Sequence, residues 1–290
     1  MIVLPDPAAL RSWVRARRVA GDRLGFVPTM GALHEGHLQL VDRARTMADQ
    51  VVASIFVNPL QFAPTEDWAA YPRDAARDQQ LLAERGAAVL FLPSVAVMYP
   101  APPAISLQAP ELTRTLCGPH RPGHFEGVLT AVAKLFHLVE PDIAVFGRKD
   151  AQQAVLIQRL VHDLDFPVRI DVAPIVREAS GLALSSRNAY LSPEQCRVAG
   201  VLSRALDAAH VAFTSGITEA AALLQVARKV LAGEPALRAQ YVELVDPVSL
   251  AALSMGRPEA LLAVAAFVGT TRLIDNIILG QGLAGDVRLG

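Results

Sequence analysis

Short apolar runs alternate with longer helical patterns through the first part of the chain. The run Val51–Val57 is almost continuously apolar, which is typical of a strand buried on both faces of a sheet. The same alternation predicts further strands and the helices between them. Strands are expected at 24–27, 51–57, 88–92, 143–146 and 168–172, and helices at 36–48, 72–85, 125–139 and 151–163. This order predicts a parallel sheet with helices on both faces.

The pattern changes after about Ser180. Two helical patterns, 193–214 and 218–231, precede an apolar run at 240–245 and two more around Leu261 and Leu273. We therefore expect an α/β protein with a Rossmann-like domain at 1–178 and a smaller α+β domain with a short antiparallel sheet at 179–290. The segment 100–123 is rich in proline and turn residues and predicts an irregular excursion.

Composition excludes several classes of protein. The 290 residues are 52% hydrophobic and carry 27 basic against 28 acidic groups, so the basic excess of a nucleic-acid-binding protein is missing. Two distant cysteines predict neither a disulfide framework nor a structural zinc site. The beginning of the chain does not resemble a signal peptide, and the longest apolar run, Leu261–Val268, is too short to span a bilayer. A soluble cytoplasmic protein is expected, with small-molecule substrates.

The first candidate site is the loop Pro28–His37 between the first expected strand and its helix. Glycines at 31 and 36 let the backbone approach a ligand closely, and the start of the following helix attracts an anion. His34 and His37 are three residues apart, so both can reach one phosphate group and neutralise charge on it. Taken alone, the motif fits a helix cap with two incidental histidines equally well.

Two further motifs also follow expected strands. Asn58 and Gln61 carry neutral amides, which suit a hydroxylated carboxylic acid better than a highly charged one. Lys149 can reach a phosphate as a point charge, and Asp150 can accept from a ribose hydroxyl. Gln153, one helical turn after Lys149, is expected to face the same cleft. Alone, the first motif fits a simple turn and the second a charged helix start.

A fourth motif lies at the predicted domain boundary. The hydroxyls of Ser185 and Ser186 and the guanidinium of Arg187 form a candidate mobile clamp for phosphate oxygens. Val176, just before it, is placed where strand-end backbone can meet an adenine edge. The alternative for this segment alone is a serine-rich linker.

Together and in this order, the motifs resemble the pantothenate synthetase family of class I synthetase-like nucleotidyltransferases. The resemblance covers the whole chain through the motifs PTMGALHEGH at 28–37, FVNPLQF at 56–62, RPGHFEGV at 121–128, VFGRKDAQQ at 145–153, GLALSSRN at 181–188 and TRLIDN at 271–276. HEGH resembles the HIGH signature of that class, and LSSRN resembles its mobile KMSKS-type loop.

The resemblance implies an ATP-dependent condensation of (R)-pantoate with β-alanine through a pantoyl-adenylate, with Mg²⁺, in a homodimer. The products are pantothenate, AMP and pyrophosphate. The smaller domain is expected to close over the site. The metal ligands within the protein remain unknown from the sequence.

The same resemblance assigns roles to residues. His37 is the implied proton donor, and the implied catalytic residues are His37, His34, Lys149 and Arg187. The implied ATP site comprises Met30, Gly31, Ala32, Leu33, His34, Glu35, Gly36, His37, Gly147, Arg148, Lys149, Asp150, Val176, Leu184, Ser185, Ser186 and Arg187. Gln61 and Gln153 are the implied pantoate ligands, with Gln61 also near β-alanine. Asn58, Tyr71 and Arg121 are further candidates.

Two residues depart from the family pattern, and two alternative functions compete with this interpretation. Ser180 stands where the family leads us to expect aspartate, and Arg148 occupies a position expected to vary. A related nucleotidyltransferase acting on a phosphorylated acceptor would need a more basic site than the amides of Asn58 and Gln61 provide. A nucleotide sensor without catalysis is expected to lack groups such as His37, which is present.

Overall fold

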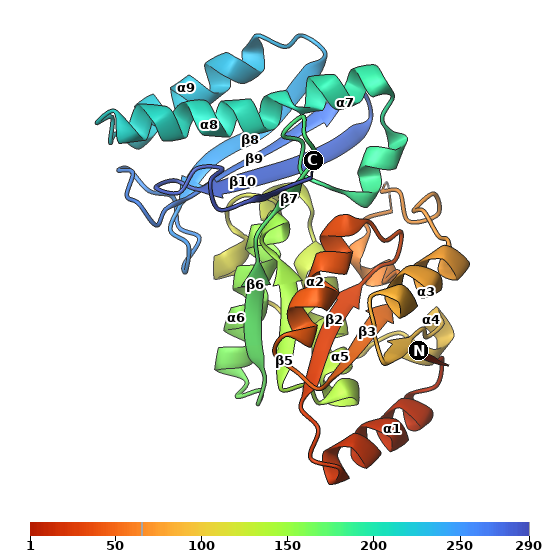
Figure 1. Cartoon of the computed structure of the whole chain (residues 1–290). Coiled ribbons are helices and arrows are strands. Elements are labelled where there is room, and N and C mark those ends of the chain that lie inside the picture. Colours follow the sequence, from red (N-terminus) through yellow and green to blue (C-terminus); the bar gives the residue numbers. More distant parts are fainter. Residues whose placement is uncertain (65, 290) are drawn as a thin grey trace. The chain divides into compact units, whose positions relative to one another are not determined.

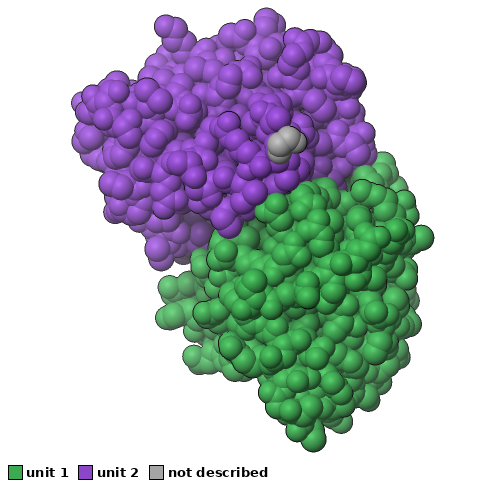
Figure 2. Space-filling model, in the orientation of Figure 1, with its two compact units in different colours: residues 1–109, 121–147, 156–173 green, residues 110–120, 148–155, 174–290 purple. Residues whose placement is uncertain are grey.

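The computed structural model describes residues 1–64 and 66–289 and divides into two compact units (Figures 1 and 2). Unit 1 comprises Met1–Ala109, Arg121–Gly147 and Leu156–Ala173, and unit 2 comprises Pro110–His120, Arg148–Val155 and Pro174–Gly290. Two short segments from within the expected first domain (1–178), 110–120 and 148–155, thus belong to unit 2. The domain boundary between residues 178 and 179 stays a prediction.

Unit 1 is built on a parallel six-stranded sheet with the order β1-β4-β3-β2-β5-β6. Its strands are β1 (Ile2–Leu4), β2 (Leu24–Thr29), β3 (Gln50–Ile55), β4 (Val89–Phe91), β5 (Ile143–Gly147) and β6 (Arg169–Ala173). The predicted Rossmann-like sheet is confirmed, with β1 added at its edge. The strand order reverses between β2 and β5, and ligands of such sheets bind beyond the carboxyl ends of the strands at this reversal.

Helices cover both faces of this sheet because alternate side chains of each strand point to opposite faces. The helices are α1 (Pro7–Val19), α2 (Glu35–Arg45), α3 (Ala75–Glu84), α4 (Val95–Met98), α5 (His124–Val139) and α6 (Ala151–Asp163), whose first five residues belong to unit 2. On one face, Val41 of α2 and Leu82 of α3 share a core with Val27. On the other, Phe26 of β2 meets Phe136 of α5 edge to face, with ring centroids 6.4 Å apart.

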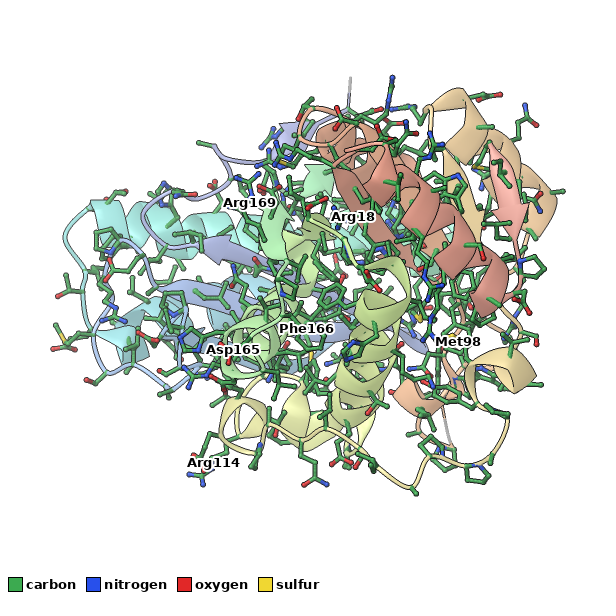
Figure 3. All side chains as sticks on the ribbon, turned by 90° about the horizontal axis from the view of Figure 1, so that it is seen from below. Arg18, Met98, Arg114, Asp165, Phe166 and Arg169 are labelled. Atoms are coloured by element: carbon green, nitrogen blue, oxygen red, sulfur yellow. The ribbon has the colours of Figure 1, made fainter. Side chains whose placement is uncertain are left out.

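The loops of unit 1 add one short 3-10 helix, η1 (Pro59–Gln61), after β3. At the end of α1, Arg18 (labelled in Figure 3) donates to Asp142 at 2.7 Å, just before β5. Asp142 also accepts from the N–H of Leu24 at 2.6 Å, so one carboxylate aligns the starts of β2 and β5. This contact fixes the two strands that flank the reversal.

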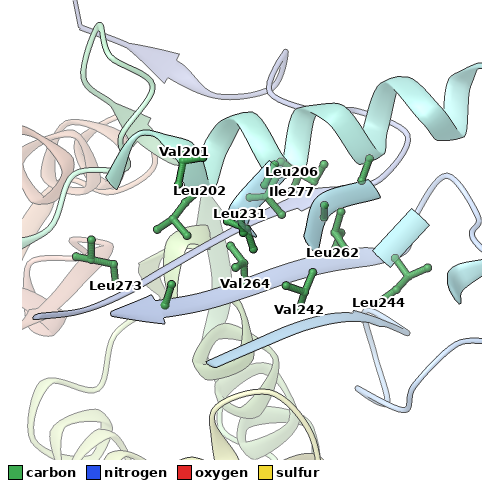
Figure 4. Packing of buried hydrophobic residues seen from close by; sticks show 14 of the residues in the cluster. Val201, Leu202, Leu206, Leu231, Val242, Leu244, Leu262, Val264, Leu273 and Ile277 are labelled. Carbon is green, nitrogen blue, oxygen red and sulfur yellow. The ribbon is translucent and has the colours of Figure 1, made fainter. Parts of the chain in front are cut away.

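Unit 2 has an antiparallel sheet of the order β10-β9-β8, made of β8 (Leu237–Val245), β9 (Leu261–Val268) and β10 (Thr271–Ile278). Helices α7 (Pro193–Ala199), α8 (Val201–Thr214) and α9 (Ala220–Ala232) complete its main core. Leu206 of α8 and Leu231 of α9 pack there against Val242, Leu262 and Ile277 of the strands (Figure 4). The predicted small α+β fold is confirmed.

The opposite face of this sheet holds a second apolar cluster. Leu261 and Ala263 of β9 point there, because they alternate with Leu262. Leu116 is buried against them, and Val155 of α6 packs on the same cluster. The segment 110–120, predicted to be irregular, contains the 3-10 helices η2 (Glu111–Thr113) and η3 (Gly118–His120).

The structure differs from the sequence prediction at residue 200, where one expected helix is two. Gly200 ends α7 and begins α8. Its carbonyl accepts the hydroxyl of Ser203 at 3.0 Å, while the helical hydrogen bond from the N–H of Arg204 is stretched to 3.5 Å. A serine hydroxyl that competes for a helix carbonyl in this way interrupts the helix.

A two-stranded parallel pair, β7 (Val176–Arg177) and β11 (Val287–Arg288), completes unit 2 with the 3-10 helices η4 (Arg148–Asp150) and η5 (Ser186–Tyr190). Strands of two residues are too short for a period-2 pattern to reveal them in a sequence. Across the described residues, no helix combines the length and the apolar character that crossing a bilayer requires.

Candidate functional site

The loop after β2 follows a backbone path that most side chains avoid. Gly31 has φ +80° and Ala32 has φ +49°, both in the left-handed region, which glycine adopts freely and alanine does not. Thr29 fastens the loop to the neighbouring strand. Its Oγ1 donates to the carbonyl of Ser54 at 2.8 Å and accepts the N–H of Gly31 at 3.2 Å. The loop is therefore a fixed structure at the end of β2.

A buried carboxylate on α3 supplies a second attachment. Asp78 accepts the N–H of Ala32 on Oδ2 and the N–H of Leu33 on Oδ1, each at 2.8 Å. The side chain is 1% exposed, and burial raises the pKa of Asp78 against the opposing effect of these two N–H groups. Asp78 is not among the residues predicted from the sequence. The sequence feature that could have revealed it is an acidic residue on the apolar stripe of α3, one helical turn before Leu82.

The two histidines stand together at the start of α2. His34 is the N-cap, and the imidazole rings of His34 and His37 lie 4.1 Å apart between centroids, inclined by 36°. The backbone N–H of His34 donates to Nδ1 of His37 at 3.4 Å, a long contact. With Nδ1 accepting, the proton of a neutral His37 ring resides on Nε2. The predicted convergence of the two rings is thus present, and His37 is oriented as an Nε2–H donor.

The side chain of Glu35, in the same motif, makes a contact between two helices. Its carboxylate accepts from Arg85 at 2.7 Å, and Arg85 also donates to Asp42 at 2.5 Å. These pairs join the first and the last turn of α2 to the end of α3. The backbone of Glu35, within the first turn of α2, still presents an N–H that no helical carbonyl can accept.

Asn58 closes the turn after β3. Its Nδ2 donates to the carbonyl of Gly127 at 2.9 Å, and its Oδ1 accepts from the N–H of Leu60 at 3.2 Å and the hydroxyl of Tyr99 at 3.1 Å. Asn58 is fully buried. Its amide is therefore engaged within the protein, which favours a positioning role over direct substrate contact.

Gln61 differs from Asn58 although both carry the same amide group. Its carbonyl accepts from Nδ1 of His124 at 2.8 Å and from Arg121 at 3.3 Å. Its half-buried side chain has no hydrogen bond to any residue within 1–64 and 66–289. The backbone is thus fixed while the amide remains available, which is the arrangement expected of a substrate ligand.

The remaining candidates of unit 1, Arg121 and Tyr71, support this turn. Arg121 binds Glu66 through two nitrogens, at 2.7 and 2.8 Å. Burial raises the pKa of Glu66, but the hydrogen bond and charge of Arg121, with smaller contributions, outweigh it, and the net pKa is lowered. Tyr71 is 6% exposed and stands edge-on to Phe62, with centroids 5.8 Å apart. Both residues position the chain around Gln61.

A cavity of about 240 Å³ opens at the ends of β2, β3 and β4. Met30, Gly31 and Asp78 form part of its wall, and Trp68 and Arg73 lie at another part. Neither histidine lines it. The cavity adjoins the loop after β2 through Met30 and Gly31, and His34 and His37 are the groups of this loop whose chemistry suits proton transfer.

In unit 2, the predicted phosphate-binding segment after β5 is held by one amide. Asn276 of β10 donates through Nδ2 to the carbonyls of Arg148 and Lys149, at 3.0 and 2.9 Å. The ammonium of Lys149 makes no hydrogen bond or ion pair within the described residues, and Asp150 is exposed. The backbone is again fixed while the charged group remains available. Gly147, the last residue of β5, belongs to unit 1.

The glutamine pair on α6 divides in the same way. Gln152, 5% exposed, accepts the N–H of Cys117 at 2.8 Å and donates to the carbonyls of Leu112 and Thr115 at 2.9 and 3.0 Å. Gln152 therefore anchors the segment 110–120. The side chain of Gln153 has no hydrogen-bond partner in the described part of unit 2.

The fourth motif forms a hairpin followed by η5. The N–H of Leu184 donates to the carbonyl of buried Val176 at 2.9 Å. Ser185 then caps η5 by accepting the N–H of Arg187 at 3.3 Å, and Ser186 is the first residue of η5. The hydroxyl of Ser180 accepts the N–H of Leu182 at 3.3 Å within the hairpin turn, so the departure at this position preserves a local turn.

The candidate residues thus form two groups, one in each unit. Unit 1 carries Met30, Gly31, Ala32, Leu33, His34, Glu35, Gly36, His37, Gln61 and Gly147, and unit 2 carries Arg148, Lys149, Asp150, Gln153, Val176, Leu184, Ser185, Ser186 and Arg187. Within each group the backbone is fixed by buried polar side chains. The ligands assigned to these residues stay predictions.

Comparison with known sequences gives a match over nearly the whole chain. A family profile described as Pantoate-beta-alanine ligase matches residues 2–278. The chain is 48% identical over 283 residues to the pantothenate synthetase of Thermoanaerobacter sp. (strain X514), covering 98% of this chain and 100% of that protein. It is 50% identical over 280 residues to pantothenate synthetase 1 of Bradyrhizobium diazoefficiens, covering 96% and 98%.

Solved structures match equally widely. The pantothenate synthetase of Thermus thermophilus superposes with a TM-score of 0.92 at 46% identity, covering 96% of this chain and 99% of that one. A pantoate-beta-alanine ligase of Francisella tularensis, described as complexed with beta-gamma ATP and beta-alanine, gives a TM-score of 0.79 at 33% identity, covering 96% and 98%.

Proposed function

Because this chain belongs to the pantoate-beta-alanine ligase family, we propose that it activates pantoate with ATP and then joins the activated acid to β-alanine. The enzyme class, a ligase that forms pantothenate, follows from the family and from relatives of about half identity along nearly the whole chain. The adenylate intermediate and the residue roles are the proposed part.

The observation that carries these roles is the rigid loop at the strand-order reversal, with two histidines at the first turn of α2. Backbone N–H groups at a helix start attract phosphate oxygens, and the nearby rings add hydrogen-bond donors there. Nδ1 of His37 accepts the N–H of His34 in a long contact, which favours the neutral ring with its proton on Nε2. A donor prepared in this way stabilises charge on a transferring phosphoryl group without reorganising.

In the proposed first step, a carboxylate oxygen of pantoate attacks the α-phosphorus of ATP. The bond from that phosphorus to the bridging oxygen of pyrophosphate breaks, and pyrophosphate leaves with the electron pair of that bond. The Nε2–H of His37, as the proton donor, gives a hydrogen bond to the phosphate oxygens with His34 beside it. Lys149 and Arg187 contribute positive charge to the triphosphate. No covalent enzyme nucleophile takes part.

In the proposed second step, the amine nitrogen of β-alanine attacks the acyl carbon of the adenylate. AMP leaves with the electron pair of the acyl–oxygen bond, and the nitrogen loses a proton. Gln61 and Gln153 hold pantoate through both steps, and Gln61 also contacts β-alanine. The available amides of these two residues support that role, because such groups both donate and accept.

The homodimer is proposed on the family, and the location and the domain boundary are proposed on the composition and the hydrophobic pattern of the chain. We propose a homodimer in the cytoplasm, with a domain boundary between residues 178 and 179 and a smaller domain that closes over the site. Closure would protect the mixed anhydride from water.

Magnesium is proposed as a companion of ATP. Among the described residues, no group of three or more histidine, cysteine, aspartate or glutamate side chains could hold a metal ion. The residues present therefore do not fit a protein-held metal, and the triphosphate oxygens would supply the ligands instead. We assign no step to the ion.

The test is ATP–pyrophosphate exchange with a panel of hydroxy acids. (R)-Pantoate is expected to drive exchange, and its failure to do so would remove the proposed activity. His37→Ala is expected to slow exchange by about two or more orders of magnitude, as for other donors that stabilise transition-state charge. His162→Ala is the matched control, because His162 is an exposed surface histidine on α6. Equal rates for the two variants would refute the role of His37.

A further inference from the structure

Unit 2 contains a chain of four alternating charges that the proposed catalytic steps do not use. Arg177 is fully buried and binds Asp275 through two nitrogens, at 2.7 and 2.8 Å. Its Nε donates to Asp286 at 2.6 Å. The other oxygen of Asp286 accepts from Arg148. The order Arg148–Asp286–Arg177–Asp275 balances two positive against two negative charges.

Each member of this chain belongs to a different piece of backbone. Arg148 is the first residue of η4, Arg177 is in β7, Asp275 is in β10, and Asp286 precedes β11. The ion pairs Arg148–Asp286, Arg177–Asp286 and Arg177–Asp275 join positions 138, 109 and 98 residues apart. They are therefore tertiary contacts, and they add to the backbone pairing of β7 with β11. Asp286 is the branch point, because one of its oxygens meets Arg148 and the other meets Arg177.

Two of these pieces lead directly into the proposed ATP residues. Arg148 is followed by Lys149, whose carbonyl is held by Asn276, the neighbour of Asp275. Arg177 lies in the first strand of the hairpin that ends at Leu184, and its guanidinium also donates to the carbonyl of Gly181 at 3.0 Å. The charge chain therefore joins the segment carrying Lys149 to the hairpin carrying the Leu184–Arg187 loop.

Burial determines what such a chain can do. The side chains of Arg177 and Asp286 have no exposed surface, and that of Asp275 is 2% exposed. Removing charges from water is costly, so a buried ion network adds little net stability compared with apolar packing. Its geometric requirement is strict, because a displaced partner leaves an uncompensated buried charge. These properties suit an ion network that fixes the relative positions of the backbone segments that it links.

We propose that Asp286, acting through Arg148 and Arg177, is a positioning residue that sets the spacing between Lys149 and the Leu184–Arg187 loop for ATP. The proposal rests on the ATP roles given to those residues above. It gives Arg148, which the resemblance places in the ATP site, a role in positioning the neighbouring Lys149. Asp286 does not itself touch the nucleotide.

The first test compares Asp286→Asn with the wild-type chain in ATP–pyrophosphate exchange. Asparagine keeps the size of the side chain but can no longer balance both guanidinium groups. The KM for ATP is expected to rise about tenfold or more, as loss of roughly 1.4 kcal/mol of binding free energy would produce. The KM for pantoate is expected to stay within about twofold.

Asp246→Asn is the matched control for loss of stability. Asp246 also pairs with an arginine of unit 2, Arg257, and its other side-chain partners within the described residues are Val248 and Ser249, none of them a proposed ATP residue. Both variants are expected to lower the melting temperature, and only Asp286→Asn is expected to change the KM for ATP. If both variants change the KM for ATP equally, or if neither does, the positioning role is refuted.

A second variant keeps the test decisive if Asp286→Asn does not fold. Arg148→Met leaves the fully buried pairs of Arg177 intact, and the side chain of Arg148 is 15% exposed. It is expected to raise the KM for ATP selectively, whereas Arg148→Lys restores part of the loss. An unchanged KM for ATP in Arg148→Met overturns the proposal. A wild-type chain without pantoate-dependent exchange would instead refute the proposed function, so the two failures are distinguishable.

Discussion

The carboxylate of Asp78 provides the sharpest test of how the loop after β2, which we propose binds ATP, is held. Asp78→Asn preserves the shape of the side chain but leaves one acceptor oxygen where there were two. Asp78 accepts one N–H on each oxygen, from Ala32 and from Leu33. In the variant, one of these N–H groups must face an NH₂ group, donor against donor. Because the site is buried, water cannot replace the lost partner.

The cost of that mismatch can be estimated. A buried polar group left without its partner costs about 1–3 kcal/mol. If the loop keeps its path, the cost reduces the free energy of unfolding. If the loop moves and ATP binding restores it, the cost reduces ATP affinity by about 5- to 150-fold. The two losses together are therefore expected to total about 1–3 kcal/mol.

Two measurements separate these cases: urea unfolding, and calorimetric titration with a non-hydrolysable ATP analogue, both at about pH 8, well above the usual carboxyl pKa. Asp74→Asn is the control, because Asp74 caps the same helix by accepting the N–H of Arg77 at 3.1 Å, and asparagine caps equally well. If Asp78→Asn matches Asp74→Asn within about 0.5 kcal/mol in both measurements, the attachment argument is wrong.

Two further predictions concern the turn around Gln61. In Gly127→Ala, the new Cβ would lie 2.2 Å from the carbonyl oxygen of Leu60, so the turn must shift; we expect about 1–3 kcal/mol loss of stability in urea unfolding and a raised KM for pantoate. An unchanged KM for pantoate would show that the turn does not position this substrate. Glu66→Gln tests the pair with Arg121: the lowered pKa of Glu66 means that its stabilisation is full above about pH 4.3, the ordinary glutamate value, and disappears as pH falls through the lower folded value. The unfolding free energies of Glu66→Gln and wild type, measured from neutral to acidic pH, should therefore differ at neutral pH and converge in acid.

The sheet of unit 1 could be predicted from sequence because a strand buried on both faces needs apolar side chains at nearly every position, as in Val51–Val57. The loop with His34 and His37 could be placed for a related reason. It lies between a strand and a helix that the hydrophobic pattern already locates. Strand-end loops therefore become visible once the strands are.

The supporting side chains could not be predicted, because their roles depend on tertiary contacts. Asn58 and Gln61 carry the same amide group. The amide of Asn58 is occupied by hydrogen bonds to the carbonyl of Gly127 and the hydroxyl of Tyr99, and these partners are adjacent only in the folded chain. Asp78 lies on another helix from the loop that it holds. Nothing in the order of residues pairs it with Ala32.

The second apolar face of the unit 2 sheet bears on how this protein can be divided. Leu250, Leu261 and Ala263 lie there with Leu116, and Ala151 packs on the same cluster. A fragment comprising only residues 179–290 would lack both Leu116 and Ala151, and would expose that face to water. Such surfaces drive association between chains. These contacts join positions about a hundred or more residues apart, so their formation closes a long loop. We therefore expect this part of the unit 2 core to form late in folding.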